Sequence, residues 1–159
     1  TEEQQRRNSK KYLTFLLDES YALDMSVIIE IIQFQDYTTV PETPDYIVGI
    51  TNLRGRVLPL IDMRARLKLR PGDDLTRKCI IIIRFEGMQL GLIVDNVTDL
   101  VEIDEDKITS PPQVGDNYAH VFVKEIGILD EGVTLVIDPE RLVNINELDF
   151  LEEDEEDSL

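Results

Sequence analysis

Two aspartates are the first candidates for chemistry in this sequence, because each closes an apolar run of strand length. Asp62 follows Val57–Ile61, and Asp138 follows Val133–Ile137. Two carboxylates could act as a general acid and a general base. However, Asp138 is followed by a proline and a glutamate, an order that is typical of a helix N-cap and first turn. We therefore predict that both aspartates cap short helices.

Other residues with reactive side chains are scarce. His120 is the one histidine and Cys79 the one cysteine, so neither has a second ligand at metal-binding spacing. The sequence has no Gly-rich phosphate loop and no G-x-S-x-G motif. A lone cysteine opening an apolar run fits a buried strand in the reducing cytoplasm. We expect a binding module without catalytic residues, metal or cofactor, and an enzyme built on carboxylates alone stays an alternative.

An internal repeat indicates which elements position these residues. Ile50–Asp62 aligns without gaps with Ile126–Asp138, and Tyr21–Leu23 aligns with Leu90–Leu92. A repeat of this kind indicates one structural unit that is used twice. Each unit predicts a strand, a turn, a strand, a short helix, a strand, a hairpin, a strand and a helix start. We expect two small barrels, at about residues 11–70 and 79–142, between which strands can be shared.

The segments within each unit differ in how clearly they predict an element. Tyr12–Leu17 and Cys79–Phe85 are apolar runs of strand length. Ser26–Ile32 is rich in β-branched residues, which favour strands. Its repeat partner, Asp95–Val101, has apolar residues at helical spacing and begins with an N-cap-like aspartate. On this basis we predict that both segments are short helices.

The composition excludes some classes of function. The 159 residues include 33 acidic and 16 basic residues, a formal charge of −17, which makes nucleic-acid binding unfavourable. No apolar run is long enough to cross a membrane, so we expect a cytoplasmic protein that does not insert into lipid. The hydrophobic fraction of 42% is sufficient for a core. Residues 1–10 and 152–159 are expected to be flexible or disordered, because the second stretch concentrates acidic residues.

One pair of opposite charges lies within otherwise apolar segments. Glu30 lies among four isoleucines, and Arg54 lies in the turn of the first hairpin. The second unit has Asp99 and Asp130 at the equivalent positions, so only the first unit can form an ion pair there. We predict that Glu30 and Arg54 pair across the helix and the hairpin. Solvation of each charge on its own at the surface is the alternative.

Several of these segments together resemble the CheW family of bacterial chemotaxis coupling proteins. In the first half they are Tyr21–Leu23, Ile28–Ile31, Ile47–Gly55 and Pro59–Arg64, and in the second half they are Leu90–Asp95 and Gly127–Asp138. The resemblance covers about residues 11–142, and its N-L-R-G-x-x-x-P-x-x-D block is specific. The turn Asp18–Ser20 in the first unit lacks the glycine that the family often has there.

The resemblance implies a mainly β fold of two SH3-like five-stranded barrels with short helices. It also implies a non-catalytic adaptor that docks a histidine kinase, through the regulatory domain of that kinase, onto the cytoplasmic tips of chemoreceptors. By this resemblance a receptor-binding groove would be lined by Ile28, Glu30, Ile31, Gly91, Val97 and Leu100. Glu30 and Arg54 would fix the surface that meets a partner. Core packing of the apolar residues, and an SH3-like adaptor for other signalling partners, are the alternatives.

Overall fold

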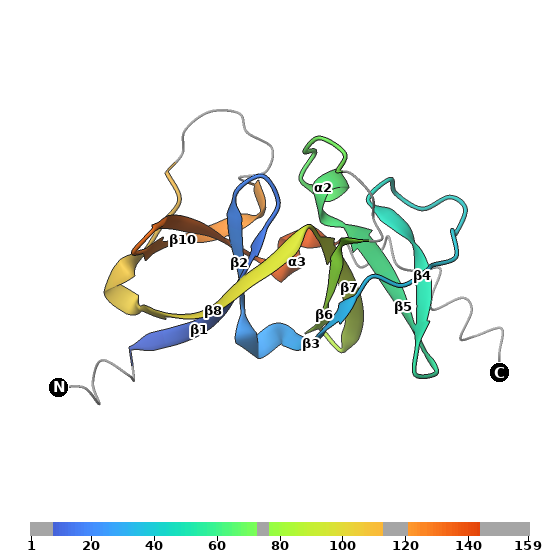
Figure 1. The fold of residues 1–159 in the computed structure, drawn as a ribbon, viewed down its shortest axis with the longest axis horizontal. Helices are drawn as coiled ribbons and strands as arrows, with labels where there is room; N and C mark the ends of the chain where they lie inside the picture. The colour runs from blue at the N-terminus through green and yellow to red at the C-terminus, as the bar shows by residue number, and fades with distance from the viewer. Residues whose placement is uncertain (1–7, 73–76, 113–120, 144–159) are drawn as a thin grey trace.

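The computed structural model describes residues 8–72, 77–112 and 121–143, which form two strongly curled β-sheets (Figure 1). The strands are β1 (Ser9–Leu16), β2 (Ser20–Asp24), β3 (Ile28–Gln33), β4 (Ile47–Leu53), β5 (Arg56–Asp62), β6 (Cys79–Phe85), β7 (Met88–Val94), β8 (Asn96–Asp104), β9 (Ile108–Thr109), β10 (Val123–Leu129) and β11 (Gly132–Ile137). The helices are α2 (Met63–Arg66) and α3 (Pro139–Leu142), with 3-10 turns η1 (Met25–Val27) and η3 (Glu105–Lys107).

Each sheet forms one barrel. Barrel A has the strand order β8-β1-β2-β11-β10-β9, and barrel B has the order β3-β6-β7-β5-β4. The mainly β fold with two small barrels is thus confirmed. Barrel A has six strands where five were expected, because the turn η3 separates β8 from the short strand β9.

The two segments that were predicted as helices are strands, so that prediction was wrong. Only Met25–Val27 is helical, as one 3-10 turn, and β3 then pairs with β6 while β8 pairs with β1. The register shifts once in each ladder, past Ile29 in β3 and past Thr98 in β8. A bulge of this kind interrupts the alternation of a strand. In the second unit the bulge shifts the apolar residues of β8 out of strict alternation, so that their spacing in the sequence resembles that of a short helix.

These two strands exchange places between the barrels. The chain leaves barrel A after β2 to form β3 in barrel B, and it leaves barrel B after β7 to form β8 in barrel A. Figure 1 shows both strands passing through the middle of the molecule. Each barrel therefore contains strands of both sequence units, and a boundary between residues 70 and 79 does not separate the two sheets.

The repeated hairpins have the same construction. In β4 the register shifts between Ile47 and Gly49, and in β10 it shifts at the equivalent place, between Val123 and Glu125. Each hairpin closes with a two-residue turn, and each packs its second strand parallel to a strand of the other unit. The strand–turn–strand repeat that the sequence predicted is confirmed.

Both aspartates are helix N-caps, as the sequence predicted. The Asp62 carboxylate accepts a hydrogen bond of 3.0 Å from the backbone N–H of Arg64, at the start of α2. The Asp138 carboxylate does the same for Glu140 at 3.0 Å, with Pro139 at the first position of α3. Capping satisfies backbone N–H groups that a helix start leaves free. Each hairpin therefore ends in a helical turn.

One apolar core joins the barrels. Phe15 of β1 and Leu135 of β11 in barrel A belong to the same buried cluster as Ile81 of β6 and Leu92 of β7 in barrel B. Burial of such side chains contributes roughly 1.5–3 kcal/mol each. The two barrels therefore share one buried core.

The ends of the chain are described only in part. Ser9 and Lys10 were expected in a flexible terminus but lie in β1, paired with Asp104 and Ile103. Residues 152–159 and His120 lie outside the described residues. Cys79 is half-buried at the start of β6 and is a free thiol. In the described ranges, no helix is long and apolar enough to cross a membrane.

Candidate functional site

Glu30 and Arg54 form a bidentate ion pair at the surface of barrel B. The two guanidinium nitrogens of Arg54 donate to the two carboxylate oxygens of Glu30 at 2.6 and 3.0 Å. The hairpin turn holds Arg54 at φ 51° and Gly55 at φ 82°, the left-handed pair that a type I′ turn requires. Asn52 supports the turn by accepting a 2.8 Å hydrogen bond from the Gly55 N–H. The pair forms as predicted, although Glu30 projects from strand β3 and not from a helix.

This ion pair connects the two edge strands of barrel B. Because β3 and β4 are the ends of the sheet order, the contact spans the line along which the barrel closes. Next to it, the Gln35 amide donates to the Thr51 hydroxyl at 2.7 Å and to the Asn52 carbonyl at 3.1 Å. The hydrogen bonds from Arg54 lower the pKa of Glu30, so the carboxylate stays ionised at neutral pH. A fixed pair of charges is thus presented to the solvent.

The apolar residues predicted to line a receptor groove divide into two groups. Ile31 of β3 and Leu100 of β8 are 43% and 54% exposed. Ile28 and Val97 are half-buried and pack against the main core. Ile31 and Leu100 occupy equivalent places in the two sequence units, so each exchanged strand presents one of them to the solvent. These exposed side chains and Glu30 are the accessible part of the predicted set.

Gly91 is buried, so it cannot belong to that accessible part. A Cβ at this position would lie 2.5 Å from Leu60 Cδ2 and 3.0 Å from Ile80 Cγ2. Both neighbours are core residues of barrel B. The glycine therefore allows β7 to pack closely against the adjacent side chains, and any influence on a partner would pass through that packing.

A second pair of exposed apolar residues was not singled out from the sequence. Val57, at the start of β5, and Val133, at the start of β11, are 51% and 56% exposed. They align in the two hairpins, so each barrel presents a valine just after its hairpin turn. The alignment of the two units contained this signal. Neither core needs an exposed valine, so a valine at the same exposed position of both units indicates another role.

A network of charges lies where the chain crosses from barrel B to barrel A. Asp95, between β7 and β8, accepts hydrogen bonds from Arg64 Nη2 at 2.5 Å and from Lys78 Nζ at 2.6 Å. Arg64 also bonds Asp18, in the turn between β1 and β2, at 2.9 Å. Both cations are buried. The hydrogen bonds from Arg64 lower the pKa of Asp95. Asp95 was expected near a helix N-terminus, and it instead ties the barrels together.

Arg66 makes a second connection between the barrels. Its guanidinium lies 4.0 Å from the centroid of the Tyr46 ring and 4.8 Å from that of the Phe122 ring. These aromatic residues immediately precede the two repeated hairpins and are equivalent in the alignment. Arg66 Nε also donates to the carbonyl of Leu142 at 2.5 Å. One cation thus bridges matching positions of both units.

The described residues offer little for catalysis or metal binding. The carboxylates of Asp62 and Asp138 are occupied in capping. Within the ranges that the structure describes, no group of three or more His, Cys, Asp and Glu side chains could hold a metal ion. The features that remain are a fixed surface ion pair and matched apolar residues, an arrangement suited to binding other proteins.

Comparison with known proteins agrees with this reading. The family model described as the CheW-like domain matches residues 11–147. A probable chemotaxis protein CheW of Rhizobium etli is 31% identical over 130 residues, which are 82% of this chain and 84% of that protein. The chemotaxis protein CheW of Treponema pallidum is 31% identical over 151 residues, with 87% and 85% covered.

A solved structure is also similar. The crystal structure of the scaffolding protein TtCheW from Thermoanaerobacter tengcongensis matches with a TM-score of 0.79 and 35% identity, over 87% of this chain and 94% of that one. The family model covers most of the chain, and the solved structure has a similar fold. The resemblance that the sequence motifs indicated is confirmed, and the chain belongs to the CheW-like domain family.

Proposed function

We propose that this chain is a non-catalytic chemotaxis adaptor that couples a histidine kinase to the cytoplasmic tips of chemoreceptors. The observation that carries the proposal is the fixed Glu30–Arg54 pair, together with the exposed Ile31 that follows Glu30 on strand β3. Family membership supports it, because the similar proteins are named as chemotaxis proteins and one is described as a scaffold.

The receptor side of the proposal uses the two exchanged strands. Ile31 and Leu100 supply apolar contact area, and Glu30 with Arg54 supplies orientation. A helical hairpin docks by placing its apolar stripe into such a surface while its charges select the register. Ile28 and Val97 are half-buried and pack against the main core, so they would support the surface from within. Gly91 would act more remotely, by letting β7 pack closely.

The kinase side of the proposal uses the hairpins. Val57 and Val133 give each barrel one exposed apolar residue next to a hairpin turn. Buried apolar anchors usually dominate the affinity of an interface, while exposed charges mainly affect the association rate. We therefore expect the regulatory domain of the kinase to cover at least one of these valines. Binding should survive moderate salt, which screens exposed charges over about 8–10 Å.

Isothermal titration calorimetry against the kinase regulatory domain and against a receptor signalling fragment tests the proposal. Val57→Glu or Val133→Glu should weaken kinase binding at least about tenfold, the effect of losing one apolar anchor. Val121→Glu, a change at another exposed valine, is the matched control and should bind normally. Absence of binding to both partners by the folded wild-type protein would contradict the proposal and favour an adaptor for other partners.

A further inference from the structure

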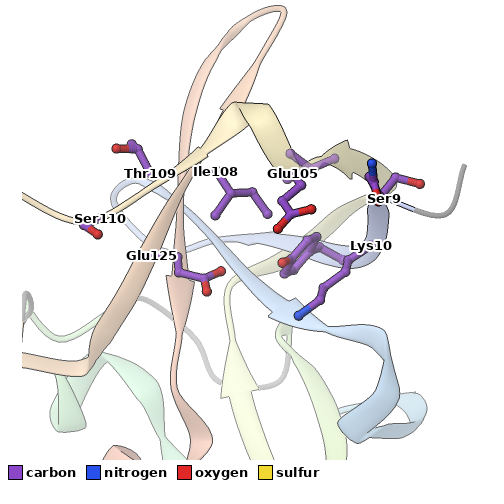
Figure 2. Close-up of a pocket in the computed structure, with 10 residues that line it drawn as sticks. Ser9, Lys10, Glu105, Ile108, Thr109, Ser110 and Glu125 are labelled. Atoms are coloured by element: carbon purple, nitrogen blue, oxygen red, sulfur yellow. The ribbon is translucent and has the colours of Figure 1, made fainter. Parts of the chain in front are cut away.

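Barrel A contains a cavity of about 460 Å³ that the adaptor function does not use. It lies between the start of β1 and the elements η3, β9 and β10 (Figure 2). The carboxylates of Glu105 and Glu125 turn toward the same space, and the Ile108 side chain lies between them. Lys10 contributes the one cation of the lining. Two acids face one base, so the cavity has a negative balance of charge.

Tyr12 is the buried polar group of this cavity. Its side chain is 1% exposed, yet it lines the space, and no hydrogen bond joins its hydroxyl to any group in the described part of the chain. Burial, together with the nearby carboxylates of Glu125 and Asp24, raises the pKa of Tyr12 to about 12. The hydroxyl oxygen itself faces the cavity, because no fully buried side-chain oxygen of the described residues lacks a hydrogen-bond partner. It would gain a hydrogen bond from a bound polar molecule.

In barrel B the space beside the residue equivalent to Glu125 is occupied by Thr38 and Tyr37. Glu125 aligns with Gly49 in the repeated hairpins, and a Cβ on Gly49 would collide with the Thr38 carbonyl and lie 2.8 Å from the Tyr37 ring. Tyr37 packs edge-on against Phe34, with ring centroids 6.2 Å apart. The space beside Gly49 in barrel B is therefore filled by neighbouring groups, whereas the space beside Glu125 in barrel A is open and polar.

The strand pairs behind these positions differ in the same way. In barrel B, Ile80 of β6 pairs with Ile93 of β7, and both are core residues. In barrel A the equivalent partners are Tyr12 and Asp24. The Tyr12 ring belongs to a buried cluster of barrel A, and the Asp24 carboxylate caps η1. Within the described residues, the Tyr12 hydroxyl is thus the polar group of this pair that has no structural role.

We propose that this cavity binds an alkyl guanidinium or alkyl ammonium group. The carboxylates of Glu125 and Glu105 would accept hydrogen bonds from the cation, and the Tyr12 hydroxyl would add one more acceptor. Ile108 and Ile103 would contact the alkyl chain. An anion would meet two carboxylates and is disfavoured. This inference is independent of the proposed adaptor function, because it involves neither the exchanged strands' exposed residues nor the valines of the hairpins.

NMR titration of the ¹⁵N-labelled full chain with butylguanidinium tests the proposal. We expect saturable shifts of the amides of Lys10, Tyr12 and Glu125, with a millimolar dissociation constant. Butylurea has nearly the same shape without the charge and should produce none of these shifts. Glu125→Gln should weaken binding about tenfold, as expected for loss of a charged hydrogen-bond acceptor. The matched control Glu86→Gln removes an exposed charge from barrel B and should leave binding unchanged.

Two further variants keep the test independent of folding. Tyr12→Phe removes only the hydroxyl and should weaken binding, while Lys10→Gln removes the competing cation and should strengthen it. A capped Gly-Arg-Gly peptide distinguishes a protein side chain from a free amine as the source: tighter binding of the peptide indicates the former, and binding of the free cation alone indicates the latter. Absence of saturable shifts, or equal binding by wild type and Glu125→Gln, would overturn the proposal.

Discussion

Replacement of Asp95 by asparagine should destabilise the fold strongly, because this carboxylate neutralises two buried cations. Arg64 Nε donates to both oxygens at 3.0 Å, Arg64 Nη2 at 2.5 Å and Lys78 Nζ at 2.6 Å. The side chain of Lys78 is 7% exposed, and Asp95 is its one anionic partner within the described residues. Removing one member of a buried ion pair typically costs about 3–5 kcal/mol.

The structure places Asp95→Asn at the lower end of that range. Arg64 would still bond Asp18 and the Arg70 carbonyl, and Asp95 itself is 29% exposed, so water relieves part of the loss. We expect a decrease of about 3 kcal/mol in the free energy of unfolding. For a chain of this length that corresponds to a melting temperature lower by about 6–12 °C.

Urea denaturation followed by far-UV circular dichroism measures this change. Asp36→Asn, at an exposed position, is the matched control and should stay within about 0.5 kcal/mol of wild type. The pKa of Asp95 is lowered in the folded state, so its contribution is present at neutral pH and disappears as the pH falls below about 4 through that lowered value. The gap between wild type and Asp95→Asn should close at low pH. A difference below about 0.5 kcal/mol at pH 7 would refute this account of the network.

Three further changes have defined outcomes. Gly91→Ala should cost about 1–3 kcal/mol in urea denaturation, because the added Cβ would lie 2.5 Å from Leu60 Cδ2, and an unchanged midpoint would contradict the packing argument. Glu30→Arg and Arg54→Glu should each impair receptor-coupled kinase activation while the melting temperature stays nearly unchanged. The double variant should recover part of the activity. Wild-type activity of both single variants would refute a coupling role. Arg66→Gln should lower the melting temperature more than Arg56→Gln, because only Arg66 contacts both Tyr46 and Phe122; equal effects would remove the bridging role.

The hairpins and their caps could be predicted from the sequence because their signals are local. A two-residue turn in the first hairpin, an apolar run and a closing aspartate occur within thirteen residues, and the second copy repeats them. The same repeat indicated the Glu30–Arg54 pair, by showing that Asp99 and Asp130 replace it in the second unit. The ion pair forms although Glu30 was predicted on a helix and lies on strand β3. The prediction required only that Glu30 lie beside the hairpin turn that carries Arg54.

The exchanged strands could not be predicted, because their partners are distant in the sequence. β3 pairs with β6 and β8 pairs with β1, and a bulge in each disguises the alternation that a strand shows. Short apolar segments with one irregularity fit a helix as well as a strand. The burial of Gly91 and the Asp95 network also depend on this exchange. Gly91 lies on β7, the last strand before the chain crosses to barrel A, and Asp95 directly follows β7.

Receptor-dependent kinase activation is the most direct test of the central claim. Purified histidine kinase and receptor signalling fragments are combined with and without this chain, and autophosphorylation of the kinase is measured with labelled ATP. The adaptor account predicts that wild-type protein increases the rate only when receptor is present, and that Glu30→Arg, folded as judged by circular dichroism, does not. A rate that is the same with and without the folded wild-type chain, in the presence of both partners, would contradict it.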